Sequence, residues 1–452
     1  MRVGPTNTPV EGARRAEAAA LPRRLGSSRF VLACFAPMWL ASCGDDVDAG
    51  PECAVPSDCP LGGDCVDGSC VQLDAATLDV EGRFPADLPA GFTLIDLGEV
   101  EVLSGETPDL SFEASGEVDS FFLVGVGRAG SFVIPLSVRA PDGSEYVLPE
   151  APSRDARQDD YFAGFAGPAT SPNRAVGRPR AAAALVPNTP ALAMMPGTWT
   201  FRLGQFRMTG GVDALGLDDV NLPLDRTMRV GVVLRTQAPP DEGAVDLVLS
   251  FHASSGLDAS SAAVDPVIQN ALGLVDEAFA DVGVRVGTVE YRDFGGELPE
   301  PLDLQGPSCL GGDVPRVFDQ IEPSGGALQL VFIDRFRCEV REGVDIGQNL
   351  AAISNGVPGL PFAYRDGVVI ATTLKDDYPD DWSLVLAHEL GHFLGLNHTV
   401  EGNLGVYDNI ADTDEENPVD YLMYPNVSES RSTRVTRDQG WVVRRHPAVR
   451  PR

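Results

Sequence analysis

Apolar and polar residues alternate along much of residues 76–243. Trp199, Phe201 and Leu203 fall on one face of an extended segment, with polar residues between them. This period of two is typical of a strand with one buried face, and Pro141-Asp142-Gly143 marks a turn between such segments. We therefore expect residues 76–243 to form an all-β sandwich.

The pattern changes in residues 244–452, where strands alternate with helices. Asp265 and Pro266 predict the N-cap and first residue of a helix that Gly283 ends, and its apolar positions recur at spacings of four and three. These positions are Ile268, Leu272, Val275, Phe279 and Val282. Leu328–Ile333 is apolar throughout, as is typical of a strand buried on both faces of a parallel sheet. We expect an α/β domain with a mixed, mostly parallel twisted sheet.

The N-terminus has the pattern of an export signal. Arginines precede a 12-residue apolar run from Phe30 to Ala41. As a helix this run is about 18 Å long, too short to span a bilayer. It ends in Leu40-Ala41-Ser42-Cys43, which resembles the bacterial lipobox, and ordinary signal cleavage is the alternative. The resemblance implies a lipoprotein signal over residues 1–43, lipidation of Cys43 and a lipid anchor in the membrane, at the bacterial outer membrane or cell surface.

The mature cysteines predict disulfides. Residues 44–75 form an acidic Cys-rich spacer, and export to an oxidising compartment favours two disulfides within it, with the pairing left open. A zinc site is the weaker reading, because the segment has no C-x-x-C pair and no nearby His. Cys309 and Cys338 are expected to pair in the last domain. The spacer cysteines are Cys53, Cys59, Cys65 and Cys70.

The charge limits the partners. The formal net charge is −32, which argues against binding nucleic acid or an anionic membrane face by electrostatics. We therefore expect no nucleic-acid partner.

The candidate chemistry lies in residues 388–398. We expect a helix that begins at Trp382 with Asp381 as its N-cap. On that helix His388 and His392 stand four residues apart and share one face, so both imidazoles can reach one metal ion.

A straight continuation of this helix would carry His398 away from that ion. Gly395 tolerates the left-handed conformation that ends a helix, so the chain can turn back and His398 can supply a third ligand. Three imidazoles leave one coordination position of zinc open for water, as in catalytic rather than structural sites. Glu389, next to the first ligand, is the candidate general base. One catalytic Zn²⁺ and peptide hydrolysis without a covalent intermediate are predicted.

The segment His388–His398 resembles the extended signature of the metzincin metallopeptidases at every fixed position. The resemblance implies a zinc endopeptidase acting on protein or peptide substrates, and a Met-turn in which Met423 forms an apolar floor beneath the ligands. Leu422–Pro425 is similar to the matrixin Met-turn, whereas Asp408–Thr413 resembles the acidic segment of pappalysin-like peptidases. Asp414 stands where that second branch usually has Pro, so the branch stays open.

The resemblance also implies a substrate that lies along an exposed edge strand. Residues 351–355 are the candidate edge, with an ordinary hairpin as the alternative. Two other functions remain open, a catalytically silent surface-binding lipoprotein and a zinc amide hydrolase acting on cell-wall or small substrates.

Acidic clusters are candidates for a structural Ca²⁺ site, but their spacing is not that of an EF-hand, and helix capping or a solvated loop is the favoured interpretation. Their residues are Asp376, Asp377, Asp408, Asp412 and Asp414. The remaining histidines, His252 and His446, have no carboxylate or His neighbours in sequence and are expected at a strand end or in the tail.

Overall fold

The structure is a computed structural model, and it describes most of the chain beyond residue 87. The described residues are 63–66, 69–72, 88–127, 131–148, 171–179, 181–207, 222–223, 227–304, 314–322, 324–341, 344–345, 347, 350–354, 356–360, 366–401 and 406–452. The predictions for the signal peptide, Cys43, Cys53, Cys59 and Cys309 fall outside these residues.

A two-stranded hairpin lies in the Cys-rich spacer. Strands β1 (Gly63–Val66) and β2 (Ser69–Gln72) pair antiparallel, with Cys65 opposite Cys70 in the register. The number and pairing of disulfides in this segment stay predictions.

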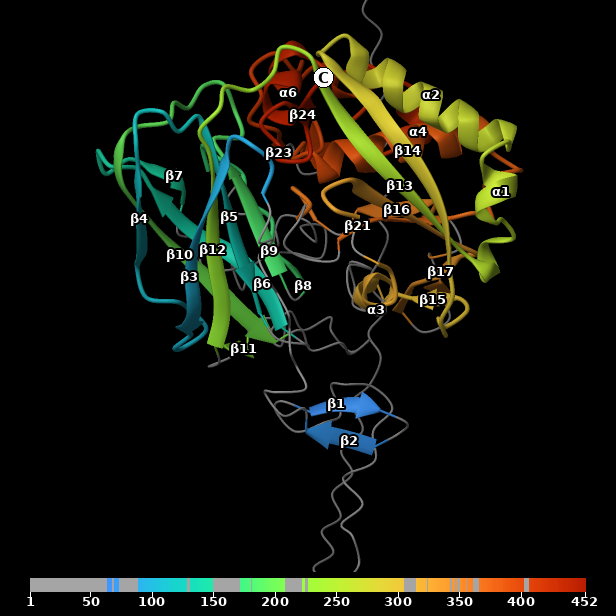
Figure 1. Ribbon diagram of the computed structural model, residues 1–452, viewed down its shortest axis with the longest axis horizontal. Coiled ribbons are helices and arrows are strands. Elements are labelled where there is room, and N and C mark those ends of the chain that lie inside the picture. The colour runs from blue at the N-terminus through green and yellow to red at the C-terminus, as the bar shows by residue number, and fades with distance from the viewer. Residues whose placement is uncertain are drawn as a thin grey trace, which may run out of the picture. The chain divides into compact units, whose positions relative to one another are not determined.

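The sandwich consists of two antiparallel sheets, drawn in blue and green in Figure 1. The first has the order β3 (Phe92–Glu101), β12 (Thr227–Arg235), β5 (Ser120–Val126) and β9 (Ala181–Val186). The second has the order β11 (Leu222–Pro223), β10 (Gly197–Arg207), β6 (Ser131–Arg139) and β7 (Glu145–Val147), with β4 (Leu110–Ala114) beside β10 and β8 (Arg178–Pro179) beside β6.

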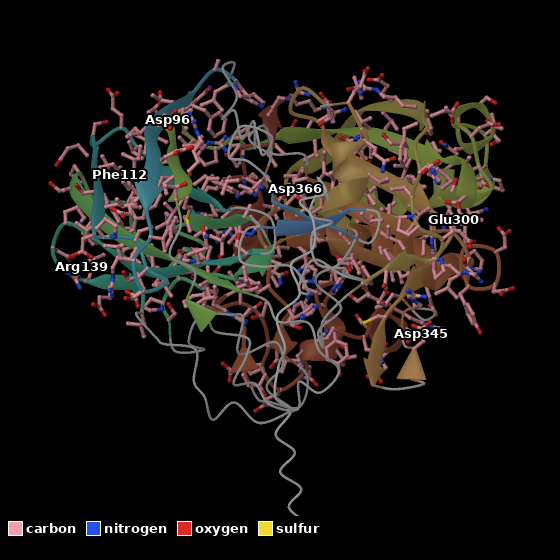
Figure 2. The ribbon with its side chains drawn as sticks, turned by 90° about the horizontal axis from the view of Figure 1, so that it is seen from below. Asp96, Phe112, Arg139, Glu300, Asp345 and Asp366 are labelled. Carbon is pink, nitrogen blue, oxygen red and sulfur yellow. The ribbon has the colours of Figure 1, made fainter. Side chains whose placement is uncertain are left out.

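The alternating apolar residues pack the two sheets of the sandwich against each other. Trp199, Phe201 and Leu203 are all buried in one core with residues of both sheets. Phe112, labelled in Figure 2, packs edge-on against Phe121 of the other sheet with ring centroids 4.9 Å apart. The predicted buried face is confirmed.

The remaining strands form a mixed sheet of the order β14 (Val284–Phe294), β13 (Gly243–His252), β16 (Leu328–Ile333), β21 (Gly367–Ala371) and β20 (Ala352–Ser354). The first four strands are parallel, and β20 runs antiparallel to β21. The short β24 (Arg450–Pro451) pairs with the start of β13. The prediction of a mixed sheet is confirmed.

The central strand β16 is buried on both faces, as its continuous apolar run predicts. Leu328, Leu330 and Phe332 face the core that contains the long helices. Val331 and Ile333 face a second core, which includes α3 (Val314–Asp319) and the strands β15 (Leu302–Asp303) and β17 (Phe336–Arg337). Cys338 lies in this second core and is disulfide-bonded, while its pairing with Cys309 stays a prediction.

Two long helices, α2 (Pro266–Ala280) and α4 (Pro379–Phe393), pack against each other and on the sheet. Figure 1 shows α2 beside β14, and α4 contacts β20 and β21. The predicted start of α2 is confirmed, because Asp265 accepts hydrogen bonds from the backbone N–H groups of Val267 and Ile268 at 2.9 and 3.0 Å. Among the described residues, no helix has both the length and the apolar character needed to cross a membrane.

Short elements complete this part of the chain. They are η3 (Ala253–Ser255), α1 (Ala259–Ala262), β18 (Glu339–Arg341), β19 (Val344–Asp345), β22 (Val400–Glu401), β23 (Val406–Tyr407), η5 (Pro418–Asp420), α5 (Val427–Ser430) and α6 (Arg437–Val443).

One sandwich sheet differs from the predicted half-buried pattern. Phe122, Val124, Ala183 and Leu185 of β5 and β9 lie in the same hydrophobic core as α2 and α4. These two strands are therefore covered on both faces. The second sandwich sheet covers one face, and the α/β domain that contains α2 and α4, here called the helical domain, covers the other.

Candidate metal centre

Helix α4 begins at Pro379, and the prediction that it begins at Trp382 is wrong. Pro379 has a fixed φ and lacks an N–H group, so it suits the first helical position. Asp381 lies in the first turn and is not the N-cap, which is Tyr378. A carboxylate in the first turn still interacts favourably with the helix dipole.

The helix ends as the metal-binding geometry requires. The Gly395 N–H donates to the His392 carbonyl and the Leu396 N–H donates to the Gly391 carbonyl, both at 2.9 Å, which is the hydrogen-bond pattern of a Schellman motif. Gly395 has a φ of +101°, a conformation that side-chain-bearing residues rarely adopt. The chain turns back at this residue toward His398.

The three predicted histidines converge. The metal-binding atoms of His388, His392 and His398 all lie within 4.8 Å of one another. Among the described residues, they are the one cluster of three or more side chains that could hold a metal ion. The ring centroids are 4.5–5.2 Å apart. Imidazole nitrogens at this spacing fit a single Zn²⁺ ion.

Backbone carbonyls orient two of the rings. The His388 Nδ1 donates to the Leu422 carbonyl at 2.7 Å, and the His392 Nδ1 donates to the Leu396 carbonyl at 2.8 Å. Because Nδ1 carries the proton, Nε2 is the nitrogen left to bind a metal. These second partners could not be predicted from residue spacing.

Burial favours the neutral form of His392. It lowers the pKa of His392 well below the ordinary 6.5, and the other two histidines lower it further. The neutral imidazole is the form that coordinates a metal. The donor set therefore fits zinc in geometry, and the neutral form of His392 suits a metal ligand.

Glu389 lies on the same helix, one residue after the first His. Burial raises its pKa to about 8, and this effect is opposed by a hydrogen bond of 2.6 Å from the Ser354 N–H to Oε2. A cation at the His cluster would favour the charged carboxylate. The bond from Ser354 ties Glu389 to β20, the strand that the sequence predicted as the substrate edge.

Met423 is fully buried in the core beneath the helix. A Cβ added to Gly391 would lie within 3.0 Å of the Met423 Sδ, closer than Cβ atoms approach other atoms. The Met423 carbonyl accepts a hydrogen bond of 2.9 Å from the Thr399 N–H, next to the third His. Gly391 thus admits Met423 under the helix, a role that sequence reasoning did not identify.

Three of the acidic residues have other partners. Asp376 binds Lys375 at 2.7 Å, Asp408 accepts from Ile410 N–H and Thr413 Oγ1, and Asp414 accepts from Glu416 N–H. Within the described residues these carboxylates do not form a metal-binding group. The structure thus gives no support to the Ca²⁺ prediction.

His446 lies in the C-terminal tail after α6, as expected, but its burial there was not predicted. It is fully buried, with its ring centroid 5.3 Å from that of Phe122 and 5.4 Å from that of Phe393. Burial lowers its pKa to about 3. His252 lies at the end of β13, as expected, and accepts from the Ser254 N–H that starts η3.

Comparison with known families identifies the segment that contains these features. Residues 364–430 match the family model described as Pregnancy-associated plasma protein-A, Peptidase M43. This segment is pappalysin-like. It includes the three histidines, the acidic segment and the Met-turn, so the resemblance to metzincins is confirmed there, and the match favours the pappalysin branch over the matrixin branch.

Two solved structures are similar at low sequence identity. Metalloproteinase-II from Bacteroides fragilis is 14% identical with a TM-score of 0.27, and the alignment covers 50% of this chain and 62% of that protein. Archaemetzincin from Methanopyrus kandleri is 16% identical with a TM-score of 0.27, covering 45% of this chain and 95% of that one. This chain thus spans 62% of the length of the Bacteroides protein. No curated protein matches the sequence.

Proposed function

We propose that this protein is a zinc-dependent endopeptidase. The observation that carries the proposal is the convergence of the metal-binding atoms of His388, His392 and His398 within 4.8 Å, next to Glu389 on α4. Zinc bound there would act as a Lewis acid on the scissile carbonyl and would lower the pKa of a water molecule to about 7. The pappalysin-like match over the same segment supports a protein or peptide substrate.

Glu389 is the proposed general base. Its carboxylate would accept the proton of the attacking water and pass it to the leaving amine. The Ser354 N–H holds one oxygen of this carboxylate at 2.6 Å, which leaves the other oxygen to take the proton.

The substrate would bind as an additional strand on β20. Ala352, Ile353 and Ser354 pair with β21 on one side, and no described strand lies on the other. An extended peptide can use the backbone groups of such an edge. Because Ser354 also bonds Glu389, the strand that would hold the peptide also positions the base.

Export and a lipid anchor at Cys43 are a second part of the proposal. They are supported by the apolar run Phe30–Ala41 and the lipobox-like residues 40–43. Radiolabelled palmitate should label the wild-type protein expressed in a bacterial host, and Cys43→Ser should abolish the label. Equal labelling of both would exclude this anchor.

The catalytic proposal is tested by metal analysis and proteolysis of the mature protein. We expect about one zinc per chain and casein cleavage that a chelator abolishes. Glu389→Gln should keep the zinc and lose roughly 10²–10⁴-fold in rate. Glu277→Gln, an exposed position on α2, is the matched control.

Each alternative has its own outcome. A wild type without stoichiometric zinc, or a Glu389→Gln variant as active as wild type, would refute the assigned chemistry. Cleavage of peptidoglycan amides with an uncut peptide library would indicate the amide hydrolase. Bound zinc without either activity would favour the surface-binding lipoprotein.

A further inference from the structure

The sandwich and the helical domain share a core through β9. Even-numbered residues of β9 (Ala181–Val186) lie in the sandwich core, and odd-numbered residues lie in the core that contains α4. Two of those odd-numbered residues are alanines, whose small side chains allow the two parts to approach closely. The third is Leu185, which lies at the turn around Gly395 that leads to His398.

Leu185 packs at Gly395, the residue where the chain turns toward His398. A Cβ at Gly395 would lie 3.6 Å from the Leu185 Cδ2, which is ordinary van der Waals distance. The side chain is 1% exposed, so this contact is closed to water. The sandwich therefore covers the segment that precedes the third histidine.

A separate set of hydrogen bonds reaches the segment that follows it. Asn409 Nδ2 donates to the Pro172 carbonyl at 2.7 Å and to Asn188 Oδ1 at 2.9 Å. Thr189 Oγ1 donates to the Asn409 carbonyl at 2.9 Å. Both the side chain and the backbone of Asn409 are thus held by the sandwich.

These bonds continue to the third histidine through the backbone. The Asp408 N–H donates to the Thr399 carbonyl at 3.3 Å, and Thr399 directly follows His398. Fixing Asn409 therefore restrains Asp408, and Asp408 restrains the residue next to His398.

Charged side chains lock the two parts together at a further point. Arg445 Nη2 donates to Asp119 Oδ1 at 3.0 Å, and Arg235 Nη1 donates to the Arg444 carbonyl at 2.7 Å. Asp119 and Arg235 belong to the sandwich, and the other two residues follow α6. The interface combines an apolar core with directional bonds, as fixed rather than transient contacts do.

We propose that the β-sandwich is a positioning element of the metal centre, in which Leu185 and the Asn188–Asn409 bond hold the segments on either side of His398. This inference rests on the proposed zinc site. His388 and His392 are fixed by α4 itself, whereas His398 lies beyond the helix and depends on these neighbours.

The test measures zinc affinity by competition with a chelator in the full mature chain. Leu185→Ala and Asn409→Ala should each weaken zinc binding by about 10-fold, because displacing groups that orient a ligand typically costs 10- to 100-fold in affinity. In addition, Asn188→Ala combined with Asn409→Ala should be no worse than Asn409→Ala alone, since the pair shares one bond.

Matched controls separate positioning from stability. Leu136→Ala removes a buried leucine from β6, in the second sandwich sheet. Asn417→Ala removes a 2.9 Å hydrogen bond to Asp414 in the loop after the third histidine. Both should bind zinc like wild type when measured below their unfolding temperatures. If Leu185→Ala fails to fold, Thr189→Val tests the same interface by removing the hydroxyl that donates to the Asn409 carbonyl and accepts from the Ala191 N–H.

The outcomes separate the two proposals. A wild type that binds no zinc refutes the metal site and this inference with it. A wild type that binds zinc, with Leu185→Ala and Asn409→Ala folded and equal to it in affinity, refutes the positioning role alone. Weakened binding in the Asn417→Ala control would assign the effect to the loop and not to the sandwich.

Discussion

Replacing Gly391 by Ala tests whether Met423 requires a glycine in α4. In an exposed helix, Gly→Ala stabilises by about 1 kcal/mol, because Ala loses less backbone entropy and favours the helix. At Gly391 the new methyl would come within 3.0 Å of the Met423 Sδ. Relieving such overpacking typically costs about 1–3 kcal/mol. The net effect should be a loss of about 0–2 kcal/mol in the free energy of unfolding.

Gly273→Ala in α2 is the matched control. It is also a helix-interior glycine, and a Cβ there meets nothing within 4 Å. It should gain about 1 kcal/mol, so the two variants should differ by about 1–3 kcal/mol, the overpacking cost. Urea unfolding of both, with the slope unchanged, measures the difference.

The position of Met423 should also affect the zinc affinity of the proposed site. Leu422, its neighbour, accepts the 2.7 Å bond from His388. Displacing the turn should weaken zinc binding by about 10-fold in Gly391→Ala, and leave Gly273→Ala unchanged. The reasoning would be refuted if the two variants were equally stable and bound zinc equally. It would also fail if adding Met423→Ala to Gly391→Ala showed no coupling.

Three further predictions follow from the described contacts. The free energy of unfolding should fall as the pH drops from 6.5 toward about 3. The reason is that His446 is protonated in the unfolded chain over this range, whereas in the folded protein the pKa of His446 is about 3. In urea unfolding at a series of pH values, His446→Phe should remove a slope of up to about 1.4 kcal/mol per pH unit. Asp119→Ala should cost about 1.5–3 kcal/mol through the lost bond to Arg445, whereas Asp96→Ala at an exposed ion pair should cost about 0–1; calorimetry should still show one transition, and equal losses would contradict the interface. Removing zinc should lower the Tm, and restoring it to 100 times its Kd should recover about 2.7 kcal/mol; an unchanged Tm would argue against a metal held by the folded state.

Local signals predicted the elements whose ends are set by short-range chemistry. The side chain of Asp265 and the ring of Pro266 define the start of α2, and the structure has both. At α4 the start signal of Pro379 prevailed over that of Asp381, so the helix begins three residues before Trp382. The spacing of the three histidines predicted their convergence, because helix geometry places two of them and Gly395 lets the chain turn back toward the third.

Long-range packing could not be predicted in the same way. Phe121–Val124 and Ala181–Val186 are continuous apolar runs, the same signal that correctly indicated a doubly buried β16. We nevertheless predicted half-buried strands for this region, and nothing in the runs specified that α4 would cover the second face. The burial of His446 was not predicted for the same reason, because its neighbours Phe122 and Phe393 are distant in sequence.

The metal-binding segment is locally unfavourable and is stabilised by its surroundings. Gly391 weakens a helix by about 1 kcal/mol, and burying neutral histidines costs solvation. Each cost coincides with a tertiary contact: Gly391 admits Met423, Gly395 lies against Leu185, and the buried His388 donates to the Leu422 carbonyl. Residues that conflict with local preference and yet cluster at one point are typical of a functional site. The conflict would have no benefit in a helix that only covered a sheet, which is a further reason to assign chemistry to this end of α4.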